Sequence, residues 1–409
     1  MRVPGAILWA LVLCLAVAAT NRYEAPPQPA FVLGDAYAYF MLAQAAPGLP
    51  KDQLSFHHAQ RIVIPYVLGV IGHVVPVPIH RLFQILVVLM AAAILAIVAA
   101  ILNDLSVHRP QAILVLAILA FNPWAFRPYL TFPEMVNDLG FVLGLAILLR
   151  GLLKGRAAPV LLGQLVASAS RQTGLLLVPV VAVWLWRDRA RWGEMAVPRR
   201  LALCLASGVL AASVYAATAQ VAARFSGANE NAMHLVGMWS WLAMQFDTFV
   251  LAAFLARVII SPLILVGLLL VMSGSRRTHG TDSDAVPILL FASMCIWAQP
   301  LLAGPEITAG NGPRLLTIGL LPLCLALAIR LRDAGVFAGA SSSRRLLCGV
   351  ALLALGSMHH WYVLARVPSL THKVFFALAY ALACAGCVAL TAFEVRDAQR
   401  RSGSHVSIA

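Results

Sequence analysis

The stretch from Leu82 to Leu102, LFQILVVLMAAAILAIVAAIL, decides the fold class of this chain. Its 21 consecutive residues include no charged side chain. A helix rises about 1.5 Å per residue, so this stretch would be roughly as long as the hydrocarbon layer of a bilayer is thick. The pattern therefore predicts a transmembrane helix.

The composition of the whole chain agrees with a membrane protein. Of 409 residues, 61% are hydrophobic and only 11% are charged, whereas soluble proteins average roughly 25% charged residues. The formal net charge of +14 would suggest nucleic-acid binding in a soluble protein. In a membrane protein it indicates cationic cytoplasmic loops, so we predict no nucleic-acid partner.

Further apolar stretches extend the pattern along the chain, and together they predict an all-α polytopic membrane protein with about twelve crossings. The predicted spans are Ile7–Thr20, Leu82–Leu102, Ala112–Trp124, Val136–Leu149, Val160–Ser170, Gly174–Trp186, Leu201–Ala222, Phe249–Val271, Pro287–Ala303, Leu315–Ile329, Leu346–Tyr362 and Phe375–Phe393.

One apolar segment, Ile62–Pro78, does not fit the alternation of charged loops. Counting it as a crossing would put Arg2 on the opposite side from the basic clusters, which belong in the cytoplasm. We therefore predict that it lies in the outer interface, within the first external loop. The basic clusters are Arg150/Lys154/Arg156, Arg187/Arg189/Arg191/Arg199/Arg200, Arg276/Arg277, Arg330/Arg332/Arg344/Arg345 and Arg396/Arg400/Arg401.

The positions of the basic clusters also predict the domain organisation and the orientation of the chain in the membrane. Residues 1–394 form one transmembrane domain and residues 395–409 a cytoplasmic polar tail, with both termini in the cytoplasm of a bacterial-type inner membrane. The first span also resembles a signal peptide, with Arg2 before a short apolar run and Ala16-Val-Ala18 after it. We favour its retention, because a loop with functional features follows at once.

Acidic residues concentrate in the external segments, which hold half of the sixteen in the chain. A charge dragged to the bilayer centre costs about 2.5–3.5 kcal/mol, so acids at span ends are usually paired, hydrated or functional. This distribution predicts a site on the outer side. The eight residues are Glu24, Asp35, Asp52, Glu134, Asp138, Glu230, Asp247 and Glu306.

Several of these residues have a plain structural interpretation as well. Asp35 precedes an aromatic-rich segment and is as well suited to capping a helix as to catalysis. Adjacent His57 and His58 would point about 100° apart on a helix, which disfavours a shared metal ion. Glu134 and Asp138 would share one helix face, where acids also suit a helix start.

Arg171 is harder to explain as a structural residue. It lies between two short apolar spans in Ser170-Arg-Gln-Thr173, with no acid nearby in sequence. Two partners remain open: a lipid phosphate at headgroup depth, or a salt bridge to Glu134 or Asp138. Arg314 follows the turn Gly310-Asn-Gly-Pro and could also extend toward the interface.

The order of these features resembles the multi-span GT-C glycosyltransferases, which include protein O-mannosyltransferases and lipid A aminoarabinose transferases. The shared features are an Asp soon after the first span, then Arg61-Ile-Val-Ile-Pro65, and an acid-bearing second loop after Asn122-Pro123. A short Arg171-containing turn and an Arg314-led span follow. The resemblance covers roughly Met1 to Arg332 and is strongest from Phe31 to Arg171.

The resemblance implies that Asp35 is the general base that activates an acceptor hydroxyl. It implies that Glu134 or Asp138 shapes the acceptor site, and that Arg171 and Arg314 hold the phosphate of the donor. Many members carry two adjacent acids in the first loop, whereas this chain has Gly34-Asp-Ala36. The departure disfavours a metal site like that of some oligosaccharyltransferases.

Together, these features predict sugar transfer from a polyprenyl-phosphate-linked donor to a glycan, lipid or protein acceptor outside the cytoplasm. No metal ligand or cofactor is assigned, although a need for a divalent metal is left open. A transporter or lipid-linked sugar flippase is the alternative, since broken apolar segments and intramembrane charges also suit one. The remaining substrate-binding candidates are Tyr37, Tyr39, His57, His58, Arg61, Arg127, Asn137, Gln172 and Glu306.

Overall fold

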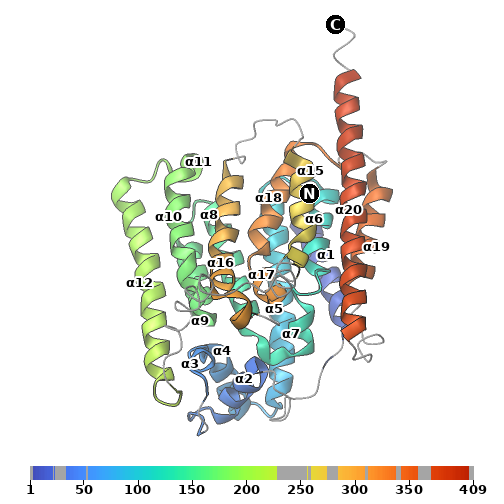
Figure 1. The fold of residues 1–409 in the computed structure, drawn as a ribbon. Coiled ribbons are helices and arrows are strands. Elements are labelled where there is room, and N and C mark those ends of the chain that lie inside the picture. Colours follow the sequence, from blue (N-terminus) through green and yellow to red (C-terminus); the bar gives the residue numbers. More distant parts are fainter. Residues whose placement is uncertain are drawn as a thin grey trace, which may run out of the picture.

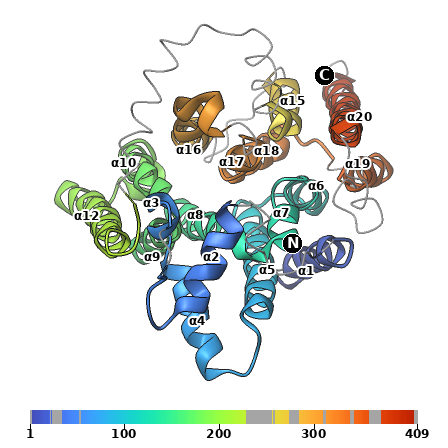
Figure 2. The ribbon, with the colours of Figure 1, turned by 60° about the horizontal axis from the view of Figure 1, so that its bottom comes forward.

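The computed structural model describes residues 3–21, 34–51, 54–227, 259–273, 284–308, 312–337, 342–357 and 370–404, with the single positions 23 and 256. Throughout these residues the regular structure is helical, and the only extended pairings are isolated bridges such as that between Leu54 and Ser226. Figures 1 and 2 show the helices side by side in one bundle. The predicted all-α fold is therefore confirmed.

The helices of the bundle match the predicted spans closely. Each predicted span contains a helix within the described residues, although only the second half of Phe249–Val271 and the first part of Leu346–Tyr362 fall there. The helices are α1 Val3–Ala19, α5 Ile79–Asp104, α6 Arg109–Ala120, α8 Asn137–Leu153, α9 Ala157–Ser170, α10 Leu177–Arg187, α12 Val197–Ala222, α15 Leu263–Ser273, α16 Ala285–Thr308, α18 Leu320–Asp333, α19 Ser342–Gly356 and α20 Leu370–Ser404.

Length and apolarity mark four segments of the described chain as able to cross a membrane alone. They are Ile79–Asp104, Pro133–Leu153, Val197–Ala222 and Phe375–Asp397. Several other apolar helices are shorter, between 10 and 17 residues. The long apolar helices are therefore compatible with a membrane protein. The number of crossings stays a prediction.

The outer surface of the bundle carries large apolar side chains. Leu205 and Val209 of α12 are 67% and 64% exposed, and Leu382 of α20 is 73% exposed. A soluble protein rarely exposes an apolar surface of this extent. In lipid the same side chains face a matching solvent, because hydrocarbon tails are as apolar as leucine.

The two ends of the bundle differ in charge. At one end, Arg150 and Lys154 at the end of α8 pair with Asp104, the last residue of α5. Arg332 of α18 donates to the Leu105 carbonyl at this same end. Several of the predicted basic clusters therefore meet at one end, where α20 also finishes (Figure 1).

The opposite end holds three helices of the first loop, namely α2 Gly34–Ala45, α3 Phe56–Ala59 and α4 Val63–Val74 (Figure 1). Helix α4 ends at Val74, and the chain enters α5 at Ile79. Gly69 lets α4 lie directly on α2, because a Cβ there would overlap the Ala43 carbonyl. Within Ile62–Pro78 the structure thus has a short helix beside α2, and its position in the outer interface stays a prediction.

Helices α8 and α9 form the closest contact that bears on the site. Gly144 faces Gly163 and Ala167, and a Cβ on Gly144 would lie only 2.7 Å from the Gly163 carbonyl oxygen. Small residues let two helix backbones approach in this way. The contact brings the start of α8, with Asp138, against the end of α9, which Arg171 follows.

We expect Gly144→Ala to lower the melting temperature of the detergent-solubilised protein, because the methyl group would collide with the α9 backbone. The expected cost is about 1–3 kcal/mol, even though alanine is the better helix former by roughly 1 kcal/mol. Gly208→Ala in α12 is the matched control, since its Cβ would meet only Val178 Cγ1, at 3.7 Å. An equal effect of both variants on thermal unfolding would contradict the contact.

Candidate functional site

Asp35 is the centre of a polar cluster at the end of the bundle opposite the basic clusters. It lies in the first turn of α2, where a carboxylate is favoured by the helix dipole. One oxygen, Oδ1, is 2.7 Å from Nε2 of His58. The other, Oδ2, accepts from Nη2 of Arg314, in α17 Gly312–Thr317. Both carboxylate oxygens thus bind side chains of other helices. Asp35 therefore has contacts beyond those of a residue that only caps its own helix.

A second carboxylate, the buried Asp138, is connected to Asp35 through Arg314. Its Oδ1 accepts from Nη1 of Arg171, and its Oδ2 accepts from the Tyr129 hydroxyl at 3.0 Å. Nε of Arg314 is 3.4 Å from the same Oδ2, so Arg314 lies between the two carboxylates. The salt-bridge interpretation of Arg171 therefore has a partner in the structure, and that partner is Asp138.

Arg61 is the third guanidinium group of the cluster. Its Nη1 donates to the Tyr39 hydroxyl at 2.9 Å, and its Nε donates to Oε1 of Gln172 at 3.0 Å. Asn137 donates to the Arg61 carbonyl at 3.3 Å. Among the residues that the structure describes, no carboxylate lies within ion-pair distance of Arg61, although its side chain is buried.

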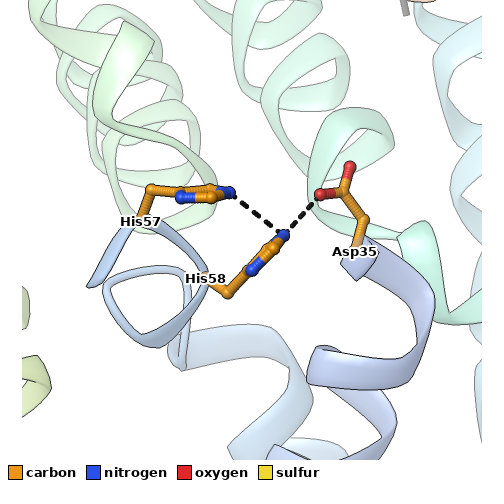
Figure 3. Close-up of side chains that lie close together, drawn as sticks. All are labelled: Asp35, His57 and His58. Atoms are coloured by element: carbon orange, nitrogen blue, oxygen red, sulfur yellow. Dashed lines mark hydrogen bonds and ion pairs between the residues drawn. The ribbon is translucent and has the colours of Figure 1, made fainter. Parts of the chain in front are cut away.

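The two histidines lie differently from the sequence prediction. Helix α3 is only four residues long, and within it the His57 and His58 rings approach with centroids 3.8 Å apart. Their Nε2 atoms are 3.1 Å apart, and both face Asp35 (Figure 3). The predicted divergence of the two rings is therefore wrong, because the side-chain rotamers, and not the helical angle alone, set the direction of each ring.

Glu134 does not join the cluster through its contacts. It lies in the short 3₁₀ helix η1 Pro133–Met135, and its Oε1 is 2.5 Å from Nδ1 of His80 in α5. Asp138 belongs to the following helix, α8. Glu134 and Asp138 therefore lie in consecutive helical elements and contact different side chains.

Arg127 occupies a separate position among α1, α7 Arg127–Thr131 and α19. Its side chain is fully buried, and Nη2 donates to Thr20 Oγ1 and Ser357 Oγ, each at 3.2 Å. Nε and Nη1 have no hydrogen-bond partner among the described residues. Burial lowers the pKa of Arg127 to about 10, so this guanidinium is still charged at neutral pH.

Two predicted residues remain. Tyr37 is half-buried in α2, two positions after Asp35 and therefore on a different side of the helix. The Glu306 side chain lies outside the described residues, as do Glu24, Asp52, Glu230 and Asp247.

Four contacts of the cluster come from residues that the sequence analysis missed: Ser55, Tyr129, Thr173 and Met135. Ser55 Oγ is 2.6 Å from Nδ1 of His58, and Thr173 Oγ1 accepts from Nε of Arg171 at 3.3 Å. Hydroxyl groups two or three positions from a charged residue are a weak signal. Tyr129 and Met135 have no such signal, because only the fold brings them to Asp138 and Arg314.

The charges of the cluster decide the ionisation of Asp35. Burial alone would raise the pKa of this carboxyl, because a low dielectric disfavours the charged form. Arg314, the hydrogen bond with His58 and Arg61 outweigh burial and hold the pKa of Asp35 well below its ordinary value. Asp35 is therefore ionised at neutral pH.

No protein-family model matches the chain, and no curated protein matches its sequence. The resemblance to GT-C glycosyltransferases thus depends on the order of sequence features alone.

Proposed function

We propose that this chain is a membrane-embedded glycosyltransferase of the GT-C kind, which moves a sugar from a polyprenyl-phosphate-linked donor to an acceptor hydroxyl. The observation that carries the proposal is the convergence of Asp35 with Arg61, Arg171 and Arg314 at one end of an apolar helix bundle. These residues come from segments far apart in sequence, with Asp35 and Arg314 separated by 279 positions.

The cluster is suited to an anionic group. Its guanidinium groups belong to Arg61, Arg171 and Arg314, and its carboxylates belong to Asp35 and Asp138. Among the residues that the structure describes, these three cations outnumber the two anions, and both side-chain hydrogen bonds of Arg61 go to neutral groups. Guanidinium binds phosphate through two parallel hydrogen bonds, and a phosphate would balance the charge.

Asp35 is proposed to take the proton of the acceptor hydroxyl. The acceptor oxygen then forms the new bond to the anomeric carbon, and the bond from that carbon to the phosphate oxygen breaks. The electron pair leaves with the polyprenyl phosphate, whose added charge the guanidinium groups stabilise. The proton ends on Asp35.

In the free protein Asp35 is a weak base, because Arg314 and His58 hold its pKa low. A donor phosphate that engages Arg314 would draw this guanidinium from Oδ2 of Asp35. The removal of a neighbouring cation raises a carboxyl pKa. Donor binding would in this way both free the carboxylate oxygen for the acceptor and strengthen it as a base.

The proposed orientation follows from the charged ends of the bundle. The end with Arg150, Lys154 and Arg332 would lie in the cytoplasm by the positive-inside rule. The Asp35 cluster would then face the outside of a bacterial-type inner membrane, with about twelve crossings and cytoplasmic termini. Outside the cytoplasm nucleotide donors are absent, so a lipid-linked donor is expected.

We expect Arg61→Ala to weaken binding of a polyprenyl-phosphate hexose about tenfold or more, because a charge-assisted hydrogen bond contributes roughly 1.5–3 kcal/mol. Arg61→Lys should have a smaller effect, since it keeps the charge and loses the planar fork. Binding to purified variants in nanodiscs measures both. Arg150→Ala, at the opposite end, is the control, and an equal loss there would contradict a local phosphate site.

The proposal is tested in proteoliposomes that contain a polyprenyl-phosphate sugar found by mass spectrometry of lipids that co-purify with the protein. A transferase should release free polyprenyl phosphate and glycosylate an added acceptor. Movement of the intact donor between leaflets, with no cleavage of its phosphate–sugar bond, would instead support a flippase and overturn the proposal.

A further inference from the structure

We infer that Asp35, His57 and His58 form a binding site for a divalent transition-metal ion, with zinc the best match to the ligand set. The inference is independent of sugar transfer, because it depends on the ligand atoms and their surroundings alone. One atom from each residue contributes, and the three atoms all lie within 4.8 Å of one another. Figure 3 shows them converging from α2 and α3.

Two of the three distances between the ligand atoms are close to those of a zinc site, and the third is below 4.8 Å. Zinc binds imidazole nitrogen and carboxylate oxygen at about 2.0–2.2 Å in a tetrahedron, which separates neighbouring ligand atoms by roughly 3.3 Å. Nε2 of His57 and Nε2 of His58 are 3.1 Å apart, and Nε2 of His58 is 2.7 Å from Oδ1 of Asp35. Side-chain rotations that lengthen these two distances by about half an ångström or less would reach the tetrahedral values.

The far side of each ring is held by a hydroxyl group. Ser55 Oγ lies 2.6 Å from Nδ1 of His58 and 3.3 Å from Nδ1 of His57. A hydroxyl has two lone pairs and can accept from both rings. With Nδ1 as the protonated nitrogen of each ring, both Nε2 atoms present lone pairs to a metal, as in histidine sites whose outer nitrogen is fixed by a partner.

The three ligand atoms can lie this close together only with a hydrogen atom or a cation between them. Two imidazole nitrogens and a carboxylate oxygen are all acceptors when metal-ready, so they repel one another unless a proton or a cation lies between them. In the metal-free protein the hydrogen bond between Nε2 of His58 and Oδ1 of Asp35, 2.7 Å long, supplies such a proton. A divalent ion would take the place of that proton and release it, as metal binding generally does.

The surroundings fit an open rather than a closed site. Two histidines and one carboxylate are a ligand set of catalytic zinc sites, in which the fourth position stays free for water or substrate. The His58 and Asp35 side chains are 13% and 18% exposed, so the cluster is reachable from outside. Arg314 on Oδ2 of Asp35 orients the carboxylate and leaves Oδ1 for the ion. A bound ion would supply a Lewis acid to an oxygen in its fourth position.

The test measures metal binding to the full-length protein after removal of any histidine tag. Purified protein is treated with a chelator, transferred to detergent buffer, and titrated with Zn²⁺ and with Co²⁺, whose visible spectrum reports tetrahedral ligation. We expect about one ion per chain, release of protons on binding, and a stronger affinity at higher pH. Failure of the wild-type protein to bind either ion would mean that a proton alone fills the cluster and would overturn the inference.

Variants assign the bound ion to these residues. We expect His57→Ala and Asp35→Asn to abolish the tetrahedral cobalt spectrum, while His73→Ala, an exposed histidine at the end of α4, leaves it unchanged. Ser55→Ala should lower affinity about 10–100-fold through the outer nitrogens, and Ser55→Thr should restore it. Thermal unfolding checks that each variant is folded. A wild-type cobalt spectrum in folded His57→Ala protein would place the ion elsewhere and would refute the site.

Discussion

Asp35→Asn is expected to lower the rate of sugar transfer by about 10²–10⁴-fold, the usual contribution of a general base. Asparagine keeps the shape of the side chain and its ability to accept hydrogen bonds, and it loses the capacity to take a proton. It also frees Arg314 from a carboxylate partner. Donor affinity should therefore stay the same or increase while the rate falls.

The measurement compares initial transfer rates and donor affinities of purified variants. Asp104→Asn is the matched control, because Asp104 is also an ion-paired carboxylate but lies at the opposite end of the bundle. His57→Ala separates the two roles argued for Asp35, since it removes a metal ligand and keeps the carboxylate. Near wild-type turnover by Asp35→Asn would remove Asp35 from the chemistry.

Arg171→Ala is expected to lower the free energy of unfolding by about 3–5 kcal/mol, because it removes the hydrogen-bonded cation of the buried Asp138 carboxylate, which then retains the longer ion pair with Arg314. The exposed fractions of the two side chains are 3% and 4%, so water cannot replace the lost partner. Unfolding in mixed detergent micelles measures the change. Arg150→Ala removes a cation from an exposed pair with Asp104 and should cost about 0–1 kcal/mol.

A double variant tests the salt bridge between Arg171 and Asp138, and a lysine variant tests the phosphate site. Arg171→Met combined with Asp138→Asn removes both charges, so it should recover much of the stability lost by Arg171→Ala. If Arg171 also binds the donor, folded Arg171→Lys protein should bind the lipid more weakly. Unchanged donor affinity in that variant would leave the salt bridge to Asp138 as its role.

The helices could be predicted from the sequence because their cause is local. An apolar run such as Leu82–Leu102 must satisfy its backbone hydrogen bonds internally in lipid, and a helix does so within one segment. The alternation of charge between loops predicts that Ile62–Pro78 does not cross the membrane, and this stays a prediction. Helix ends were less predictable: α8 begins at Asn137, so Glu134 falls in a different element.

The charged residues of the cluster could be predicted from the sequence, but the ion pairs that they form could not. The sequence indicated Asp35, Asp138, Arg171 and Arg314, because charges at the ends of apolar spans need partners or a function. It could not assign Arg314 to Asp35, since 279 residues separate them and only the packing of α17 near α2 brings them together. The close approach of α8 and α9 at Gly144 likewise decides that Arg171 meets Asp138.

By itself the sequence determined an all-helical, apolar chain with its polar groups at the helix ends. The reason is local, because an apolar run in lipid has to satisfy its backbone hydrogen bonds within its own segment. The tertiary structure alone decided that His57 and His58 turn their Nε2 atoms together toward Asp35. The physical reason is that rotamers in a four-residue helix are set by neighbours, here Ser55 behind the rings and Tyr39 edge-on to His58. Such contacts leave no periodic trace in a sequence.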